Sequence, residues 1–124
     1  MILGVGIDII EVERVRVKIE KEQGFREMVF GIQEIEYCEL KTHKFQHYAA
    51  RFAAKEAFFK ALGTGWAKGT SFNEIQILND ESGKPGIYLE GETASTLAHI
   101  KPRDLKISLT HIKETALAII IIEA

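Results

Sequence analysis

Three side chains of this sequence, two acidic and one basic, are the best candidates for chemistry. Glu56 and Lys60 lie four positions apart in a stretch that predicts a long helix, and Asp8 follows two glycines in a predicted strand. A carboxylate on the apolar side of a helix is costly to bury unless it is paired or binds a metal. If the strand packs on the helix, Asp8 and Glu56 can meet. Two carboxylates with open positions suit Mg²⁺, whose other ligands are waters and substrate phosphates.

Basic side chains elsewhere in the chain could bind the phosphates of such a substrate. The candidates that can donate charge-assisted hydrogen bonds are Lys60, Arg51, Lys44 and His111. With a bound Mg²⁺ they indicate phosphoryl-type transfer, in which catalysis is mostly positioning and charge neutralisation. Simpler interpretations also exist. Glu56 and Lys60 could form an ordinary i, i+4 pair on an exposed helix, Asp8 could cap a helix, and a strand-end histidine is more often structural.

Composition bounds the class of protein. With 124 residues we expect a single domain spanning 1–124, and 46% hydrophobic with 27% charged residues is typical of a soluble globular protein. The formal charge of −2 argues against a general nucleic-acid binder, and the single Cys38 excludes an intrachain disulfide and favours a reducing compartment. We recognise no targeting leader, and the apolar run 116–122 is too short to cross a bilayer. We therefore expect a cytoplasmic protein without nucleic-acid or membrane partners.

The longest predicted element is a helix from about Phe45 to Leu62, followed by Gly63 as its left-handed terminating residue. At 100° per residue, one apolar side would contain Phe45, Ala49, Phe52, Ala53 and Phe59, together with Glu56 and Lys60. The flank of the helix would carry Lys44, Arg51 and Lys55. The glycine-containing loop over 63–70 that follows could form an anion-binding nest, although this signal is weak.

The predicted N-terminal strand covers Ile2 to Ile10. Its alternation places Leu3, Val5, Ile7 and Ile9 on one face and Ile2, Gly4, Gly6, Asp8 and Ile10 on the other. Two glycines on one face of a strand indicate that a backbone or a ligand comes close there. Asp8 lies next along that face.

The remaining pattern predicts alternating short elements. We expect helices over 12–22, 32–40 and 92–100, strands over 71–78, 87–89, 105–112 and 116–122, and a hairpin turn over 79–85. The last strand is apolar on both faces, so it should be central in a sheet or part of an oligomer interface. On the helix over 12–22, Arg14, Lys18 and Lys21 form a basic ridge, which is either solvated or a docking surface for an acidic partner.

Four blocks of the sequence carry a resemblance to one family. Residues 4–15 and 51–65 are similar to the N-terminal and central motifs of the holo-acyl-carrier-protein synthases, 79–85 matches their Gly-Lys-Pro hairpin, and 107–111 their late strand. The resemblance implies an α+β fold with a small, mostly antiparallel sheet packed on a long central helix. It also implies a 4′-phosphopantetheinyl transferase, which moves the phosphopantetheine arm of coenzyme A to a serine of apo-acyl carrier protein and releases 3′,5′-ADP.

The same resemblance implies roles for individual residues. Asp8 and Glu56 would hold Mg²⁺, Glu56 would also orient or deprotonate the serine, and Lys60 would neutralise the transferred phosphoryl group. The nucleotide and its 3′-phosphate would be bound by Arg51, Ser108, Thr110 and His111, with Lys44 as a weaker addition, and Gly63 and Gly65 would let the loop approach coenzyme A. The ridge of Arg14, Lys18 and Lys21 would bind the acidic carrier protein.

Some expectations rest on the family as a whole. It typically forms homotrimers with active sites between neighbouring subunits, and it acts on carrier proteins of fatty-acid synthesis. The sequence departs from the family at Gly31, where a threonine commonly follows the phenylalanine. Two rival hypotheses remain at this stage: a coenzyme A or nucleotide-binding module without catalysis, and a purely structural oligomer subunit.

Overall fold

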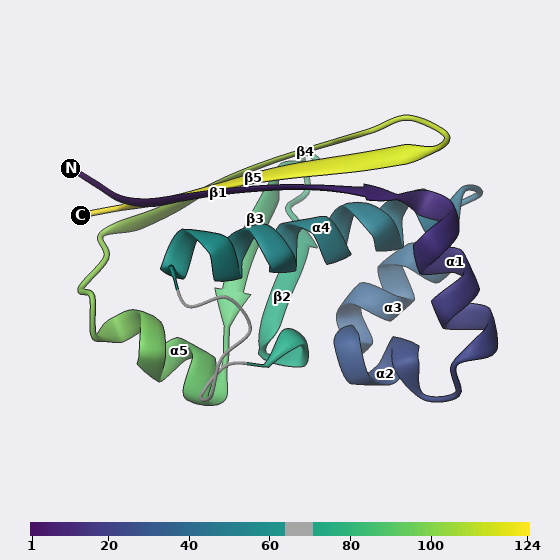
Figure 1. The fold of residues 1–124 in the computed structure, drawn as a ribbon, viewed down its shortest axis with the longest axis horizontal. Helices are drawn as coiled ribbons and strands as arrows, with labels where there is room; N and C mark the ends of the chain where they lie inside the picture. The colour runs from purple at the N-terminus through teal and green to yellow at the C-terminus, as the bar shows by residue number, and fades with distance from the viewer. Residues whose placement is uncertain (64–70) are drawn as a thin grey trace.

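The computed structural model describes residues 1–63 and 71–124. The elements are β1 (Ile2–Glu11), α1 (Val12–Lys21), α2 (Phe25–Val29), α3 (Ile32–Glu39), α4 (Lys44–Leu62), the 3₁₀ turn η1 (Phe72–Glu74), β2 (Ile75–Asn79), β3 (Pro85–Leu89), α5 (Gly91–Ala98), β4 (Asp104–His111) and β5 (Thr115–Glu123) (Figure 1). This mixture of helices and antiparallel strands confirms the predicted α+β class.

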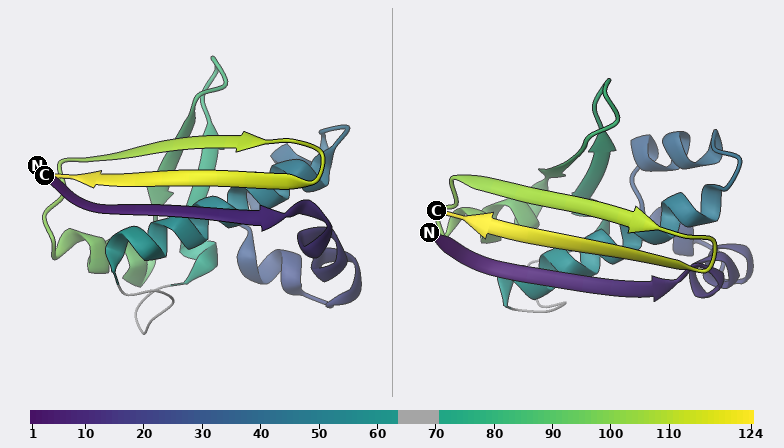
Figure 2. Two further views of the ribbon diagram at one scale, coloured as in Figure 1. Left: turned by 45° about the horizontal axis from the view of Figure 1, so that its top comes forward. Right: turned by 90° about the horizontal axis from the view of Figure 1, so that it is seen from above.

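The largest sheet has the order β1-β5-β4, with both pairs antiparallel, and β2 and β3 form a separate hairpin. The prediction that the apolar last strand is central is confirmed, because β5 lies between the other two (Figure 2). The helices and the hairpin lie on one side of the three-stranded sheet, with α4 directly beneath it, and no described element covers the other face (Figure 1).

Two glycines of β1 allow α4 to lie against the sheet. A Cβ on Gly6 would lie 1.8 Å from the carbonyl oxygen of Ala57, and a Cβ on Gly4 would lie 2.0 Å from that of Ala61. The close approach expected from these glycines is therefore made by the backbone of α4. It follows that the face of β1 carrying Asp8 points toward the helix, and the face carrying Val5, Ile7 and Ile9 points away from it.

The helix α4 differs from its predicted pattern, in which one side is apolar. Residues on nearly all of its sides are buried, including Arg51 at 2% exposure and Lys55 at 0%, whereas Lys60 is exposed. The prediction of one apolar side with Arg51 and Lys55 on a flank was wrong. The physical reason is that α4 lies between the sheet, the hairpin and the helices α1 and α3.

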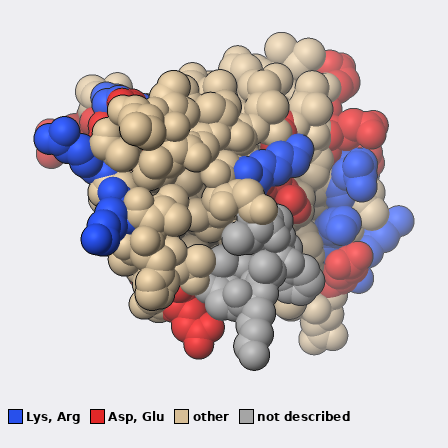
Figure 3. Space-filling model, turned by 60° about the vertical axis from the view of Figure 1, so that its left-hand side comes forward, with Lys and Arg blue, Asp and Glu red and all other residues tan. Residues whose placement is uncertain are grey.

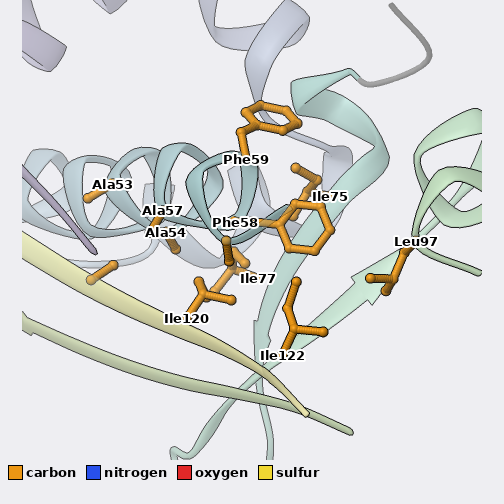
Figure 4. Packing of buried hydrophobic residues seen from close by; sticks show 12 residues of the cluster. Ala53, Ala54, Ala57, Phe58, Phe59, Ile75, Ile77, Leu97, Ile120 and Ile122 are labelled. Atoms are coloured by element: carbon orange, nitrogen blue, oxygen red, sulfur yellow. The ribbon is translucent and has the colours of Figure 1, made fainter. Parts of the chain in front are cut away.

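The main core lies where α4 meets the sheet and the hairpin. Figure 4 shows Phe58 and Phe59 of α4 close to Ile75 and Ile77 of β2 and Ile120 and Ile122 of β5, all of them buried. The alanines of α4 let the helix pack closely on its other sides, as at Ala53, Ala54 and Ala57. This core fixes α4 against β1 and β5, and thus fixes the helix that carries Glu56 and Lys60.

The main differences from the predicted elements are the start of the strand β2 and the additional short helix α2. The strand expected over 71–78 begins only at Ile75, because 72–74 form a 3₁₀ turn whose Glu74 carboxylate accepts hydrogen bonds at the start of α5, from Thr93 N (3.1 Å) and Thr93 Oγ1 (2.7 Å). The apolar patch over 25–30 contains the short helix α2, in which Phe25 and Val29 are buried. Neither feature changes the position of Asp8 or Glu56.

Candidate active site

Asp8 and Lys60 are brought together by β1 and α4. Lys60 Nζ lies 3.1 Å from Asp8 Oδ1 and donates a second hydrogen bond, of 3.0 Å, to the Ile7 carbonyl oxygen. The Lys60 side chain is 54% exposed and that of Asp8 18%, so the pair lies at the surface with the carboxylate set deeper. The glycines that precede Asp8 are the local cause, since they remove the side chains that would keep α4 away.

Glu56 lies one turn before Lys60 on the same side of α4 and is half-buried. Burial raises the pKa of the Glu56 carboxyl, and the nearby Asp8 charge raises it further, while the charges of Lys60 and Lys18 lower it. The two carboxylates therefore share one electrostatic environment, although 48 positions separate them in the chain. The structure brings together all three residues that the sequence singled out first.

A divalent cation fits this donor set chemically. Two carboxylates that repel each other, one of them partly desolvated, are relieved by a cation, and hard oxygen donors are those that Mg²⁺ prefers. In the described part of the chain no cluster of three or more His, Cys, Asp or Glu side chains could hold a metal. Asp8 and Glu56 would thus be the protein ligands, and waters or substrate phosphates would supply the rest.

A second group of predicted residues lines a cavity of about 400 Å³ between α3, α4, the hairpin and β4. Arg51, Ser108 and His111 belong to this lining. Arg51 Nε donates to the Ile77 carbonyl oxygen (3.1 Å) and Nη2 to Asn79 Oδ1 (2.6 Å). The guanidinium thus holds the hairpin against α4 and also places a positive charge at the cavity.

Asp8 and Glu56, called the acidic pair below, lie on a different side of α4 from this cavity. Arg51 precedes Glu56 by five positions, which corresponds to about 140° around the helix axis. On the sheet, Asp8 belongs to β1 and His111 to β4, with β5 between them. The two groups of candidate residues therefore lie on separate surfaces of the chain.

Four predicted residues are not part of either group or cannot be placed. Lys44 Nζ lies 3.2 Å from Glu39 Oε1, beside a different cavity of about 590 Å³, and Thr110 pairs with Leu117 on the sheet face away from α4. Gly63 ends α4 in the left-handed conformation, at φ 80°, as predicted. Gly65 lies outside the described residues.

One protein family matches most of the chain. The sequence profile of the 4′-phosphopantetheinyl transferase superfamily matches residues 4–119. The chain belongs to this superfamily.

Similar proteins cover almost the full length of the chain. It is 45% identical to the holo-[acyl-carrier-protein] synthase of Cytophaga hutchinsonii, over 98% of this chain and 97% of that one. It is 46% identical to that of Ruminiclostridium cellulolyticum, over 94% and 89%. The crystal structure of the Neisseria meningitidis synthase matches over 100% of both chains, with a TM-score of 0.90 at 31% identity. The Bacillus anthracis synthase in complex with CoA (3′,5′-ADP) covers 100% of this chain and 98% of its own, with a TM-score of 0.83 at 36% identity.

The basic ridge of this transferase-superfamily protein adjoins the acidic pair. Arg14 and Lys21 are exposed on α1, whereas Lys18 is half-buried with Nζ 5.5 Å from the centre of the Phe25 ring. The charge of Lys18 also lowers the pKa of Glu56, so the ridge and the acidic pair interact electrostatically. Figure 3 shows a broad uncharged area with charged side chains at its edges and one basic side chain beside acidic atoms within it.

Sequence reasoning missed a buried ion pair next to Glu56. Lys55 Nζ donates to Glu34 Oε1 (2.7 Å), to the Val29 carbonyl (2.7 Å) and to the Phe72 carbonyl (3.0 Å). Burial lowers the pKa of Lys55, and the Glu34 charge opposes that shift. The Glu34 carboxylate also accepts from the Gly31 and Ile77 amides, both at 3.0 Å. A lysine flanked by alanines and phenylalanines was a signal for a buried charge, but its partner, 21 positions away, could not be identified.

Proposed function

We propose that this protein transfers the 4′-phosphopantetheine arm of coenzyme A to a serine of apo-acyl carrier protein, with release of 3′,5′-ADP and dependence on Mg²⁺. The convergence of Asp8, Glu56 and Lys60 on one side of α4 is the observation that carries the proposal. The match of holo-[acyl-carrier-protein] synthases over nearly the whole chain supports the same activity.

The reaction joins the serine oxygen to the phosphorus that bears pantetheine and breaks the bond from this phosphorus to the 5′-phosphate of 3′,5′-ADP. A bound Mg²⁺ would neutralise the charge of the pyrophosphate. Glu56 orients the serine hydroxyl and accepts its proton, directly or through a water. Lys60 supplies positive charge to the transferred phosphoryl group, and Asp8 holds the ammonium in place.

The nucleotide end of coenzyme A is assigned to the cavity beside Arg51. This cavity is lined by Arg51 and His111, two of the residues expected to bind the nucleotide and its 3′-phosphate, whereas the Ser108 side chain lies on the same sheet face as that of Thr110. Because the cavity and the acidic pair lie on different sides of α4, we assign one active site to surfaces of two neighbouring subunits. This assignment supports the homotrimer expected from the resemblance.

The uncovered face of the sheet is the surface best suited to subunit contact. Val5, Ile7 and Ile9 are 54%, 54% and 63% exposed, and register places them beside the half-buried Ile121, Ile119 and Leu117 of β5. An apolar, uncovered sheet face of this kind is typical of an interaction site. Burial of this face in a trimer would remove it from water.

The protein partner is assigned to the basic ridge on α1. Arg14, Lys18 and Lys21 present positive charge next to the site where the serine must enter, which suits an acidic acyl carrier protein. We further propose that the carriers are those of fatty-acid synthesis and that the protein acts in the cytoplasm. Among the described helices none has the length and apolar character needed to cross a bilayer.

Mass spectrometry of an apo-acyl carrier protein incubated with this protein, coenzyme A and Mg²⁺ tests the proposal. We expect the carrier to gain the mass of one phosphopantetheine, and we expect the gain to disappear with a chelator or in the Asp8→Ala variant. A folded protein that leaves the carrier mass unchanged would contradict transferase activity. Binding of coenzyme A without transfer would instead favour the non-catalytic module.

A further inference from the structure

The cavity beside Arg51 contains a histidine, His47, that has no role in the mechanism proposed above. His47 lies one helical turn before Arg51 on the same side of α4 and lines the same cavity. The centre of its ring lies 5.2 Å from that of His111 on β4, at an interplanar angle of 64°, and 5.8 Å from the Tyr37 ring on α3. The Tyr37 ring in turn has the Arg51 guanidinium 4.3 Å from its centre.

The titratable and charged groups around His47 are tyrosine or basic. They are Tyr37 from α3, Lys41 and His43 from the segment before α4, Arg51 from α4, Lys84 from the hairpin and His111 from β4. In the described part of the chain no carboxylate lines this cavity. The positive charge of this lining is not balanced by a carboxylate there, so the cavity favours the binding of an anion.

Both imidazoles lie at this cavity, and one of them has a ring nitrogen already bound to a side chain. Nδ1 of His111 lies 2.9 Å from Gln46 Oε1. Since an amide oxygen only accepts, Nδ1 carries the proton in this contact. Burial and the surrounding positive charges lower the pKa of His47 to about 4, so His47 is neutral at pH 7 when the cavity holds no anion. An adjacent phosphate acts in the opposite direction, because a negative charge favours the imidazolium.

We propose that His47 is a further nucleotide-binding residue, which binds a phosphate group in this cavity together with His111 and Arg51 as His47 takes up a proton from solvent. This inference rests on the proposed function, in which the cavity receives the nucleotide. It assigns a proton-linked step to binding: the affinity for the nucleotide falls as pH rises, over the interval between the pKa of His47 before and after phosphate binding.

Calorimetric titration of the protein with 3′,5′-ADP tests this inference. Titrations from pH 5 to pH 8, each in two buffers of different ionisation enthalpy, measure both the affinity and the number of protons taken up. We expect net proton uptake by the unchanged protein at pH 5. We expect His47→Gln to bind about tenfold more weakly at pH 5, with less proton uptake, and to approach the unchanged protein at pH 8.

Two controls separate the histidine from other effects. The second ionisation of the phosphate itself, near pH 6, affects both proteins equally, so the difference between them isolates His47. His99→Gln, at the exposed C-terminal end of α5, is the matched substitution outside the cavity and should leave binding and proton uptake unchanged.

The outcomes also separate this inference from the proposed function. If the unchanged protein binds 3′,5′-ADP without proton uptake, or if His47→Gln binds it with the same affinity and pH dependence, the role of His47 is refuted and the transferase proposal stands. If the unchanged protein does not bind 3′,5′-ADP at any pH, the assignment of the nucleotide to this cavity fails together with the role of His47, and the mass of the carrier protein decides the transferase proposal separately. The measurement of proton uptake uses the unchanged protein, so it can refute the inference even if His47→Gln does not fold.

Discussion

Two lysines on α4, five positions apart, show how burial decides what an ion pair does. Lys55 and its partner Glu34 are both fully buried, and Lys55 donates to three oxygens from α2, α3 and η1. Lys60 and its partner Asp8 lie at the surface, 54% and 18% exposed. The buried pair connects elements of the fold, whereas the surface pair, beside Glu56, can exchange partners. A lysine can serve chemistry on this helix only where solvent and ligands reach it.

Removal of the buried cation should have the largest effect on the fold. Lys55→Met leaves the Glu34 carboxylate buried without its charge partner, which typically costs about 3–5 kcal/mol of unfolding free energy. Urea unfolding measures the loss, and Lys60→Met is the matched control on the same helix. A loss under about 1 kcal/mol would show that the buried pair is not a structural connection.

Substitution of Glu56, the carboxylate next to Lys55, should reduce the activity and leave the fold intact. Glu56→Gln should reduce carrier modification by about 10²- to 10⁴-fold, because the proposed proton acceptor is lost. The fold should be unchanged or more stable at pH 7: a carboxyl with a raised folded pKa binds its proton more tightly when folded, so its ionisation opposes folding.

That gain in stability has a defined pH dependence. Between the ordinary glutamate pKa and the raised folded value, the stability of the unchanged protein falls as pH rises, and Glu56→Gln removes this fall. Unfolding at pH 4 and pH 7 measures it, and the advantage of the variant should be present at pH 7 and absent at pH 4. Normal turnover in this variant would refute the catalytic assignment.

Removal of the surface cation should affect turnover more than stability. Lys60→Met should reduce turnover by about 10²- to 10³-fold, the usual cost of one group that stabilises charge in the transition state. The unfolding free energy should change by less than about 1 kcal/mol, as expected for an exposed pair. Single-turnover kinetics and urea unfolding of one preparation provide both values. A large stability loss with normal turnover would show that Lys60, like Lys55, stabilises the fold and does not serve catalysis.

A charge reversal on α1 should have the smallest effect. Lys18→Glu should weaken carrier binding several-fold at low salt and less at high salt, because the attraction of partly exposed charges is screened. Affinity measured over a series of salt concentrations tests this expectation. Lys101→Glu, an exposed lysine just beyond α5, is the control with the same change in charge. A loss of affinity independent of ionic strength would argue against the docking ridge.

The sequence predicted what local pattern determines. The extent of α4, its termination at Gly63, the two faces of β1 and the central place of β5 followed from periodicity and glycine placement. The meeting of Asp8 and Glu56 could be expected because two glycines on the Asp8 face allow a helix to come close. These features depend on residues within one element or on one packing contact.

The missed features depend on partners distant in the chain. Helical periodicity places Lys55 and Arg51 on a flank of the apolar side, whereas each is buried and donates to acceptors on other elements. The contact of His47 with His111 joins α4 to β4 across 64 positions, and no spacing rule connects them. Helical periodicity ranks the sides of one helix, but it cannot show that surrounding elements cover all of them.

The glycines of β1 also set the width of the reaction site. At position 6 a single methyl group would overlap the helix backbone, so an alanine there would act as a wedge and force the strand and helix apart. Such a wedge would leave every reactive side chain in place in the sequence while separating the two acidic groups in space. The proposed catalytic arrangement therefore depends on the lack of side chains at Gly4 and Gly6 as much as on the side chains of Asp8 and Glu56.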